Sequence, residues 1–239
     1  MKDIRKFLSK ITDKKMLVVF PHPDDESIMA GGLILIAIKM GWQVSVLTLT
    51  EGGSGKIHIN GRGRSAKEIR REEMAKAMSR LGVVDWVMWR FDDGRLKRTK
   101  KWKERLRKFF DVTNPSLVVS YDLSGVTGHP DHVSLAVEML KVAREAGVRL
   151  LWPSFLRREK QVMVDRRVTK YLQKPVYKLP MNFEESWRKW RAVSAHRSQG
   201  LDAFIGMPWW IIAMVARTEL YSEMKRQKKY RYRYVKFKM

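Results

Sequence analysis

Cysteine is absent from the 239-residue chain. Its absence excludes disulfides, thiolate metal sites, cysteine nucleophiles and iron–sulfur clusters, so any bound metal must be held by histidine and carboxylate side chains. Long apolar runs are also missing. The longest uncharged apolar stretches, Ile28–Ile38 and Phe204–Ala216, are too short to span a membrane, and the second contains Pro208. The N-terminal segment carries Asp3 and no small-residue cleavage site, so no signal peptide is predicted and a cytoplasmic protein is expected.

Acidic residues are few, with 25 Asp and Glu against 49 Lys and Arg and a formal net charge of +24. The last fifteen residues, 225–239, hold eight basic and no acidic residues, yet removing them still leaves 41 basic against 25 acidic side chains. Such an excess favours anionic partners. Because no nucleic-acid-binding motif accompanies it, nucleic acid is not predicted as the primary ligand. An anionic or lipid-linked substrate and a peripheral contact with an anionic membrane both fit the charge.

Strand and helix patterns alternate along the first two thirds of the chain. Continuous apolar or β-branched runs predict five strands, at Met16–Phe20, Gln43–Thr50, Trp86–Phe91, Leu117–Tyr121 and Val148–Trp152. Between them, helical periodicity covers the stretch that ends at Met40 and the segments Ser65–Leu81, Leu96–Val112 and Asp131–Ala146. Strands that alternate with helices over short connections predict an α/β fold: a Rossmann-like, mostly parallel, doubly wound sheet with helices on both faces.

The pattern becomes irregular beyond Pro153. Gln161–Val164 and Val168–Tyr171 are candidate extra strands, and Phe183–His196 and Phe204–Leu220 are expected to be helices. The basic segment 225–239 is interpreted as a terminal strand or a solvated extension of a single domain that covers residues 1–239.

Two short segments at predicted strand ends concentrate histidine and aspartate. PHPDDE (21–26) follows the first strand, HPDH (129–132) follows the fourth, and together they hold three of the five histidines. Proline and acidic residues in a first helical turn are also what an ordinary helix N-terminus contains. That explanation leaves the histidines unaccounted for. Because ligands bind outside the carboxyl ends of strands in open α/β sheets, the two segments predict a metal site.

The residue types suggest which side chains bind the metal and which one accepts a proton. His22 and Asp25 are three residues apart, which places both on one face as a helix begins, and His132 can approach from the other strand end. Two imidazoles and one carboxylate leave a coordination position open, as in catalytic zinc sites, but iron and other divalent metals accept the same set. Asp24 remains beside the metal and is able to take a proton from water.

The two segments resemble those of the PIG-L/LmbE-like family of zinc-dependent N-deacetylases. Further similarities are TEGGSG at 50–55, IRREE at 69–73, the Asp93-Gly94 pair and HRSQ at 196–199, so the resemblance runs through residues 16–200. It implies that His22, Asp25 and His132 hold Zn²⁺. It further implies hydrolysis of an N-acetyl group on an N-acetylglucosamine-type small-molecule substrate.

The resemblance also assigns roles to other residues. Asp24 would be the general base, His129 would stabilise the oxyanion and Asp131 would orient a neighbouring histidine. Substrate contacts are expected from Arg70, Asp93 and His196. Each of them has a competing explanation: an Arg70–Glu73 ion pair, an ordinary Asp-Gly turn at Asp93 and a structural helix histidine at His196.

Two alternatives remain open at this stage. The first is a hydrolase with the same site that acts on another N-acylated amine conjugate. The second is a basic protein that binds nucleic acid or an anionic membrane and whose His/Asp site is not catalytic.

Overall fold

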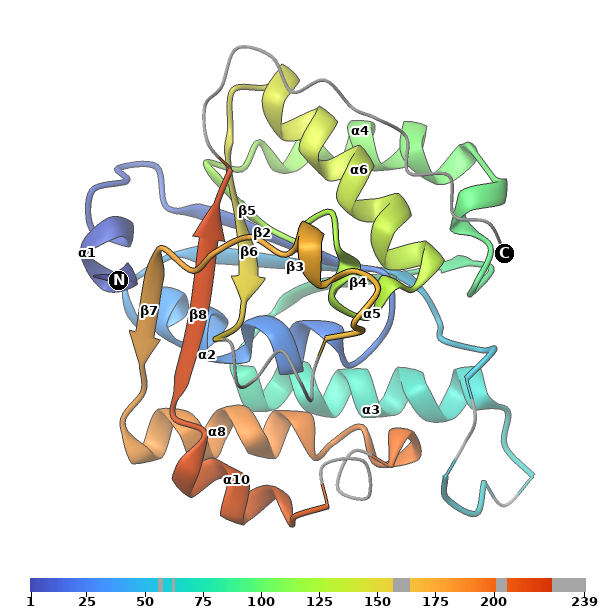
Figure 1. The fold of residues 1–239 in the computed structure, drawn as a ribbon. Helices are drawn as coiled ribbons and strands as arrows, with labels where there is room; N and C mark the ends of the chain where they lie inside the picture. Colours follow the sequence, from blue (N-terminus) through green and yellow to red (C-terminus); the bar gives the residue numbers. More distant parts are fainter. Residues whose placement is uncertain (56–57, 62, 157–163, 201–205, 225–239) are drawn as a thin grey trace.

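One eight-stranded sheet runs through the protein, with the order β1-β7-β8-β6-β5-β2-β3-β4 (Figure 1). The computed structural model describes residues 1–55, 58–61, 63–156, 164–200 and 206–224. Helices α2 and α3 lie on one face of the sheet, and α4 and α6 lie on the other. This arrangement confirms the predicted Rossmann-like α/β fold.

The five predicted strands form the parallel part of the sheet, β6-β5-β2-β3-β4. Their bounds are β2 Lys15–Phe20, β3 Gln43–Thr50, β4 Asp85–Phe91, β5 Leu117–Val119 and β6 Arg149–Ser154. The residues Met16–Phe20 and all of β5 are buried, because helices cover both faces of the central strands. A continuous apolar run, rather than an alternating one, is the sequence pattern that such strands require.

Four long helices supply the two covering layers. They are α2 Asp25–Lys39, α3 Ala66–Leu81, α4 Lys101–Thr113 and α6 Pro130–Glu145. The start of α3 is fixed by a capping box, in which Ser65 and Glu68 satisfy each other's backbone amides, and its end by Gly82 in the left-handed conformation (φ 79°). Each face of the sheet therefore has its own apolar core, one under α2 and α3 and one under α4 and α6.

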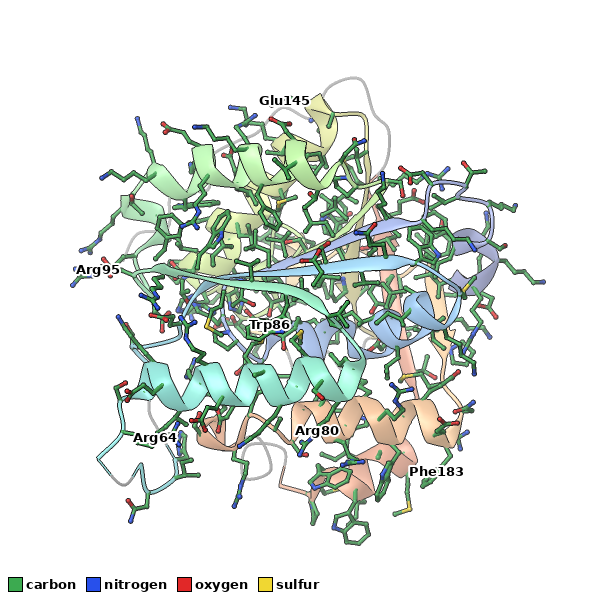
Figure 2. All side chains as sticks on the ribbon, turned by 180° about the vertical axis from the view of Figure 1, so that it is seen from behind. Arg64, Arg80, Trp86, Arg95, Glu145 and Phe183 are labelled. Atoms are coloured by element: carbon green, nitrogen blue, oxygen red, sulfur yellow. The ribbon has the colours of Figure 1, made fainter. Side chains whose placement is uncertain are left out.

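A second layer of helices packs outside α2 and α3. Helix α8 (Phe183–Val193) begins with a capping box of Asn182 and Glu185 and contacts α2 and α3, and α10 (Trp209–Val215) packs on α8. Figure 2 shows Arg80 between α3 and α8, where its guanidinium donates to the carbonyl of Arg191. This outer layer stands next to the strand ends of β6 and β8.

Two expectations for the C-terminal part are wrong. Residues 204–220 are not one helix, because α10 ends at Val215 and Thr218–Glu223 forms strand β8, antiparallel to β6 and to β7 (Tyr177–Pro180). Residues 168–171 are not a strand, because Thr169–Tyr171 forms a 3₁₀ turn, η2. Backbone pairing with β6 and β7 outweighs the local helical pattern of the segment that becomes β8.

Smaller differences occur elsewhere. The helix expected at 96–112 is divided into a 3₁₀ turn, η1 (Leu96–Arg98), and α4, and a short helix, α5 (Gly125–Gly128), precedes α6. The sequence analysis also missed the N-terminal β1 (Lys2–Asp3), which pairs with β7, and α1 (Ile4–Leu8). The candidate strand 161–164, apart from Val164, and the basic segment 225–239 lie outside the described residues.

Among the helices of the described part, none is long and apolar enough to cross a membrane. The cytoplasmic location and the single domain over 1–239 remain predictions.

Candidate metal centre and substrate cavity

The two histidine-rich segments meet at the carboxyl edge of the sheet because the strands they follow, β2 and β5, are hydrogen-bonded neighbours. Pro21 and His22 leave the end of β2, and Thr50 Oγ1 at the end of β3 donates to the Pro21 carbonyl at 2.9 Å. Asp24 then caps α2 in an unusual backbone conformation, with φ 113°. A non-glycine residue at such a φ is strained, and strain of this kind concentrates at functional sites.

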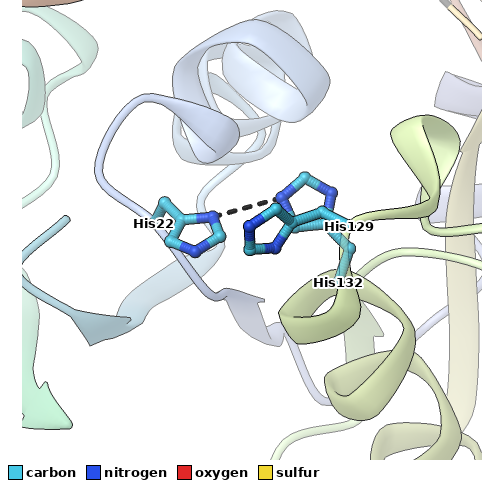
Figure 3. Close-up of side chains that lie close together, drawn as sticks. All are labelled: His22, His129 and His132. Atoms are coloured by element: carbon cyan, nitrogen blue, oxygen red, sulfur yellow. Dashed lines mark hydrogen bonds between the residues drawn. The ribbon is translucent and has the colours of Figure 1, made fainter. Parts of the chain in front are cut away.

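Three donor atoms converge between these segments. His22 Nδ1 lies 3.1 Å from His132 Nε2 (Figure 3), and Asp25 Oδ2 lies 3.5 Å from the first nitrogen and 3.7 Å from the second. Ligand atoms bound tetrahedrally at zinc distances are roughly 3.4 Å apart, so the three separations are those of a shared ion. The structure thus brings together His22, Asp25 and His132 as the sequence predicts.

Neighbouring groups orient two of these donors. His132 Nδ1 lies 2.9 Å from the carbonyl oxygen of Gly125, which leaves Nε2 directed at the other donors. Tyr121 stacks on the His132 ring with a centroid separation of 4.3 Å, and its hydroxyl donates to Asp25 Oδ1 at 2.5 Å. Asp25 Oδ2 is thereby the oxygen that faces the histidines.

The other nitrogen of His22 faces a pair of carboxylates. His22 Nε2 lies 2.9 Å from Asp93 Oδ1 and 3.4 Å from Asp131 Oδ2, and Asp131 in turn accepts from the backbone amides of Gly94 and Leu96. Asp93, expected at the sugar, therefore also contacts the candidate ligand His22. The atoms of His22, Asp93 and Asp131 form a second group close enough to hold a cation, as do the ring nitrogens of His22, His129 and His132.

These contacts shift several pKa values. Burial lowers the pKa of His22, but hydrogen bonds to Asp131, Asp25 and Asp93 outweigh it and hold the pKa well above 6.5. For Asp93, burial raises the pKa, but its hydrogen bond and charge interaction with His22 dominate and lower it to about 2. Burial likewise opposes ionisation of Asp25, whose pKa is nevertheless lowered by the charges of His132 and His22. The field of the site therefore favours ionised carboxylates beside the histidines.

Asp24 and His129 have properties of a proton acceptor and a hydrogen-bond donor. Burial and the neighbouring Asp25 charge raise the pKa of Asp24 to about 7, close to the value that suits a general base at neutral pH. Burial, followed by the charge of His22, lowers the pKa of His129 below 6.5, so its neutral form is favoured. Since His129 Nδ1 accepts from the Asp131 amide at 3.2 Å, the ring proton of neutral His129 lies on Nε2.

Arg70 is buried beneath the Gly-rich segment that follows β3. It is 4% exposed, its guanidinium donates to Gln199 Oε1, and a Cβ at Gly52 would lie 1.9 Å from its Nη1. Glu73, the expected ion-pair partner, instead accepts from the Ser198 amide and hydroxyl at 2.8 and 2.7 Å. Arg70 lines the cavity, and its Nε is buried without a hydrogen-bond partner in the part of the chain described.

His196 lies behind the cavity rather than on its wall. It is 1% exposed, and its Nε2 lies 3.5 Å from Glu26 Oε1, one residue beyond the candidate ligand Asp25. The hydrogen bond to Glu26 and the Glu26 and Asp24 charges raise its pKa above 6.5 despite the opposing effect of burial. The position fits a residue that supports the first turn of α2 and does not line the cavity.

The candidate ligands and several of the groups around them open into a cavity of about 690 Å³. Its walls include the three candidate ligands, Asp24, Arg70, Asp93 and His129, but also residues that the sequence analysis did not single out: Tyr121, Gln199, Lys189, Trp190, Ile212 and Glu219. Tyr121 ends a predicted strand, where ligands bind in open α/β sheets, and Gln199 lies in the HRSQ motif. Both residues could therefore have been identified from the sequence. No comparable local signal identifies the residues of α8, α10 and β8.

Comparison with known proteins places this site in a family context. The PIG-L family, described as GlcNAc-PI de-N-acetylase, matches residues 17–143. A probable N-acetyl-alpha-D-glucosaminyl L-malate deacetylase 2 from Bacillus anthracis is 34% identical over 125 residues, covering 50% of this chain and 55% of the relative. A 1D-myo-inositol 2-acetamido-2-deoxy-alpha-D-glucopyranoside deacetylase from Saccharomonospora viridis is 33% identical over 177 residues, covering 60% of this chain and 63% of the relative.

The fold is shared with solved structures. The N,N'-diacetylchitobiose deacetylase of Pyrococcus horikoshii superposes with a TM-score of 0.68 at 20% identity, covering 92% of this chain and 89% of that one. This chain spans only part of the two curated relatives named above, matching 55% and 63% of their lengths.

Proposed function

The chain belongs to the PIG-L family, and from this membership we propose that it is a metal-dependent hydrolase that removes the N-acetyl group from an N-acetylglucosamine-type amino-sugar derivative. The observation that carries the proposal is the convergence of His22 Nδ1, His132 Nε2 and Asp25 Oδ2 within 3.1–3.7 Å of one another at the cavity. Two imidazole nitrogens and a carboxylate oxygen are a donor set that fits Zn²⁺ and leaves a position for a reactant.

His22, Asp25 and His132 would hold the zinc ion. Zinc bound there would polarise the amide carbonyl and lower the pKa of water to about 7. Tyr121 and the Gly125 carbonyl keep Asp25 and His132 in the orientation that binding requires. Asp93 and Asp131 position His22 through its other ring nitrogen.

Proton transfer and oxyanion stabilisation fall to two residues at the same edge. Asp24, with a pKa of about 7, accepts the proton that the attacking water loses. Neutral His129 donates its Nε2 hydrogen to the developing oxyanion, and the Asp131 amide fixes the ring through Nδ1. The hydroxyl of the water ends on the acyl carbon, and the proton accepted by Asp24 passes to the departing amine as the C–N bond breaks.

The polar part of the cavity provides contacts for sugar hydroxyls. Ser54, Asp93 and Gln199 line it from the segments that follow β3, β4 and α8, and Arg70 lines it from α3. Arg70 is held in place by its hydrogen bond to Gln199. The exposed Arg95 (Figure 2) follows Gly94, which lines the cavity, and its charge together with the net charge of the chain favours an anionic or lipid-linked amino-sugar derivative.

The proposal is tested by acetate release from a panel of N-acetylglucosamine derivatives together with metal analysis. We expect about one zinc per chain, loss of turnover in Asp24→Asn with the metal retained, and loss of the metal in His132→Ala. A control, Asp92→Asn, changes an exposed carboxylate that does not line the cavity. If the protein binds no stoichiometric metal and releases no acetate from any member of the panel, the proposed activity is wrong.

A further inference from the structure

The cavity consists of two chemically different lobes on opposite sides of the candidate metal centre. The strand order β8-β6-β5-β2-β3-β4 places the ends of β2 and β5, with the metal ligands, in the middle. The polar lobe lies toward β3 and β4 and contains Ser54, Arg70 and Asp93. The apolar lobe lies on the other side, toward β6 and β8.

The apolar lobe is built almost entirely from hydrocarbon and aromatic side chains. Among the residues that the structure describes, its main apolar walls come from α2, the segment directly after β6, α8 and α10, as Ile28, Met29, Phe155, Trp190, Ile212 and Val215. Ile28 and Met29 belong to the first turns of α2, directly after the candidate ligand Asp25, and both remain partly exposed within the cavity. The lobe therefore begins at the reacting centre itself.

The two charged groups of this lobe are already neutralised by each other. Lys189 Nζ lies 2.8 Å from Glu219 Oε1, and both side chains are nearly inaccessible to solvent. Glu219 also accepts from the backbone amides of Gly32 and Leu33 at 2.7 and 2.9 Å. This pair therefore needs no polar partner from a ligand.

Building on the function proposed above, we propose that the apolar lobe binds the hydrocarbon chain of the acyl group, so that the enzyme removes acyl groups longer than acetyl from an amino sugar. The amide that is cut has to lie at the metal ligands and Asp24. If the sugar hydroxyls occupy the polar lobe, the acyl substituent on the other side of the amide points toward β6 and β8. Water adds across the C–N bond, giving a fatty carboxylate and the free amine.

The size of the cavity agrees with this assignment. The volume of about 690 Å³ covers both lobes and is in the range that holds whole drug-sized ligands, such as a sugar together with an acyl chain. An acetyl group contributes only one methyl beyond the carbonyl. Burial of each further methylene in an apolar site strengthens binding by about fourfold at full transfer. A chain that fills the lobe would thus bind more tightly than acetyl, by up to about fourfold for each buried methylene.

The test is a series of N-acylglucosamines with acetyl, butyryl, hexanoyl and octanoyl groups. We expect kcat/KM for amine release to rise along the series, by up to about fourfold for each methylene. Val215→Glu places a charge on the wall of the lobe at a residue that is 69% exposed, so folding is preserved. It is expected to remove the chain-length dependence, whereas the matched control Met214→Glu, next to it but outside the cavity, is expected to retain it.

Binding gives a readout that does not depend on turnover. Calorimetry of N-octanoylglucosamine against chelator-treated protein is expected to show a negative heat-capacity change, which marks burial of apolar surface, and to lose it in Val215→Glu. If acetyl is released at least as fast as octanoyl and no such change is seen, the inference is overturned while the proposed deacetylase stands.

Two further outcomes separate the possibilities. If kcat/KM rises as much for octyl N-acetylglucosaminide as for N-octanoylglucosamine, the chain enters from the glycosidic side. The assignment of the lobe to the acyl group is then wrong. If no amide of the series is cut, the proposed function fails, and octanoyl binding to Met214→Glu but not to Val215→Glu still supports the apolar lobe as a chain-binding site.

Discussion

Replacing Lys189 by methionine should destabilise the protein strongly, because it leaves the Glu219 carboxylate buried without its cationic partner. The Lys189 and Glu219 side chains are only 6% and 5% exposed and lie 2.8 Å apart. Removal of one partner of a buried ion pair typically costs about 3–5 kcal/mol. Glu219 keeps hydrogen bonds from Gly32, Leu33 and Tyr221, so we expect a loss near the lower end, about 3 kcal/mol.

Urea unfolding of Lys189→Met measures this loss. The matched control is Asp165→Asn, which breaks an ion pair whose Arg167 side chain is 82% exposed and which should cost no more than about 1 kcal/mol. The double variant Lys189→Met/Glu219→Gln should regain part of the stability, since it leaves no unpaired charge. If Lys189→Met costs no more than Asp165→Asn, or if the double variant is less stable than the sum of its parts, the argument from the buried charge is refuted.

Three other predictions concern the site. Gly52→Ala would place a Cβ 1.9 Å from Arg70 Nη1 at a backbone φ of 64°, so kcat/KM should fall by about 10- to 100-fold, the equivalent of one charged hydrogen bond, whereas Gly53→Ala should have little effect. His196→Gln should destabilise most at low pH. The folded pKa of His196 is raised, so its contribution is fully present below about 6.5 and is lost as pH rises through the folded value, which thermal unfolding of both proteins across pH would reveal. Phosphorylated N-acetylglucosaminides should be cut faster than neutral ones at low ionic strength, with the advantage falling as salt is added, and equal rates in initial-velocity assays would contradict a role for the basic surface.

The parallel strands and the convergence of the candidate metal ligands could be predicted because their signals are local. A buried central strand such as β2 reads as a continuous apolar run, and its neighbour β5 follows from the same pattern. The rule that ligands gather at the carboxyl ends of strands then brings His22 and His132 together without any knowledge of the loops. The same rule could have identified Tyr121, the last residue of the predicted strand Leu117–Tyr121.

The other wall of the cavity could not be predicted, because its positions depend on pairing between distant segments. Thr218–Glu223 lies at the end of an apolar stretch whose local pattern favours a helix, and only its insertion between β6 and β7 makes it a strand. The contact of Asp93 with His22 likewise depends on a loop from β4, a strand that does not pair with β2. Sequence periodicity carries no information about such pairings.

The insertion of β8 has a consequence for the order in which the molecule can form. A nascent chain that has not yet supplied residues 218–223 leaves the backbone edges of β6 and β7 unpaired, although every candidate metal ligand has already been synthesised. Open strand edges invite association between chains. Growth conditions that slow translation near this point, or truncations before residue 218, should therefore yield aggregates in which the ion-binding residues are present but the wall opposite them was never built.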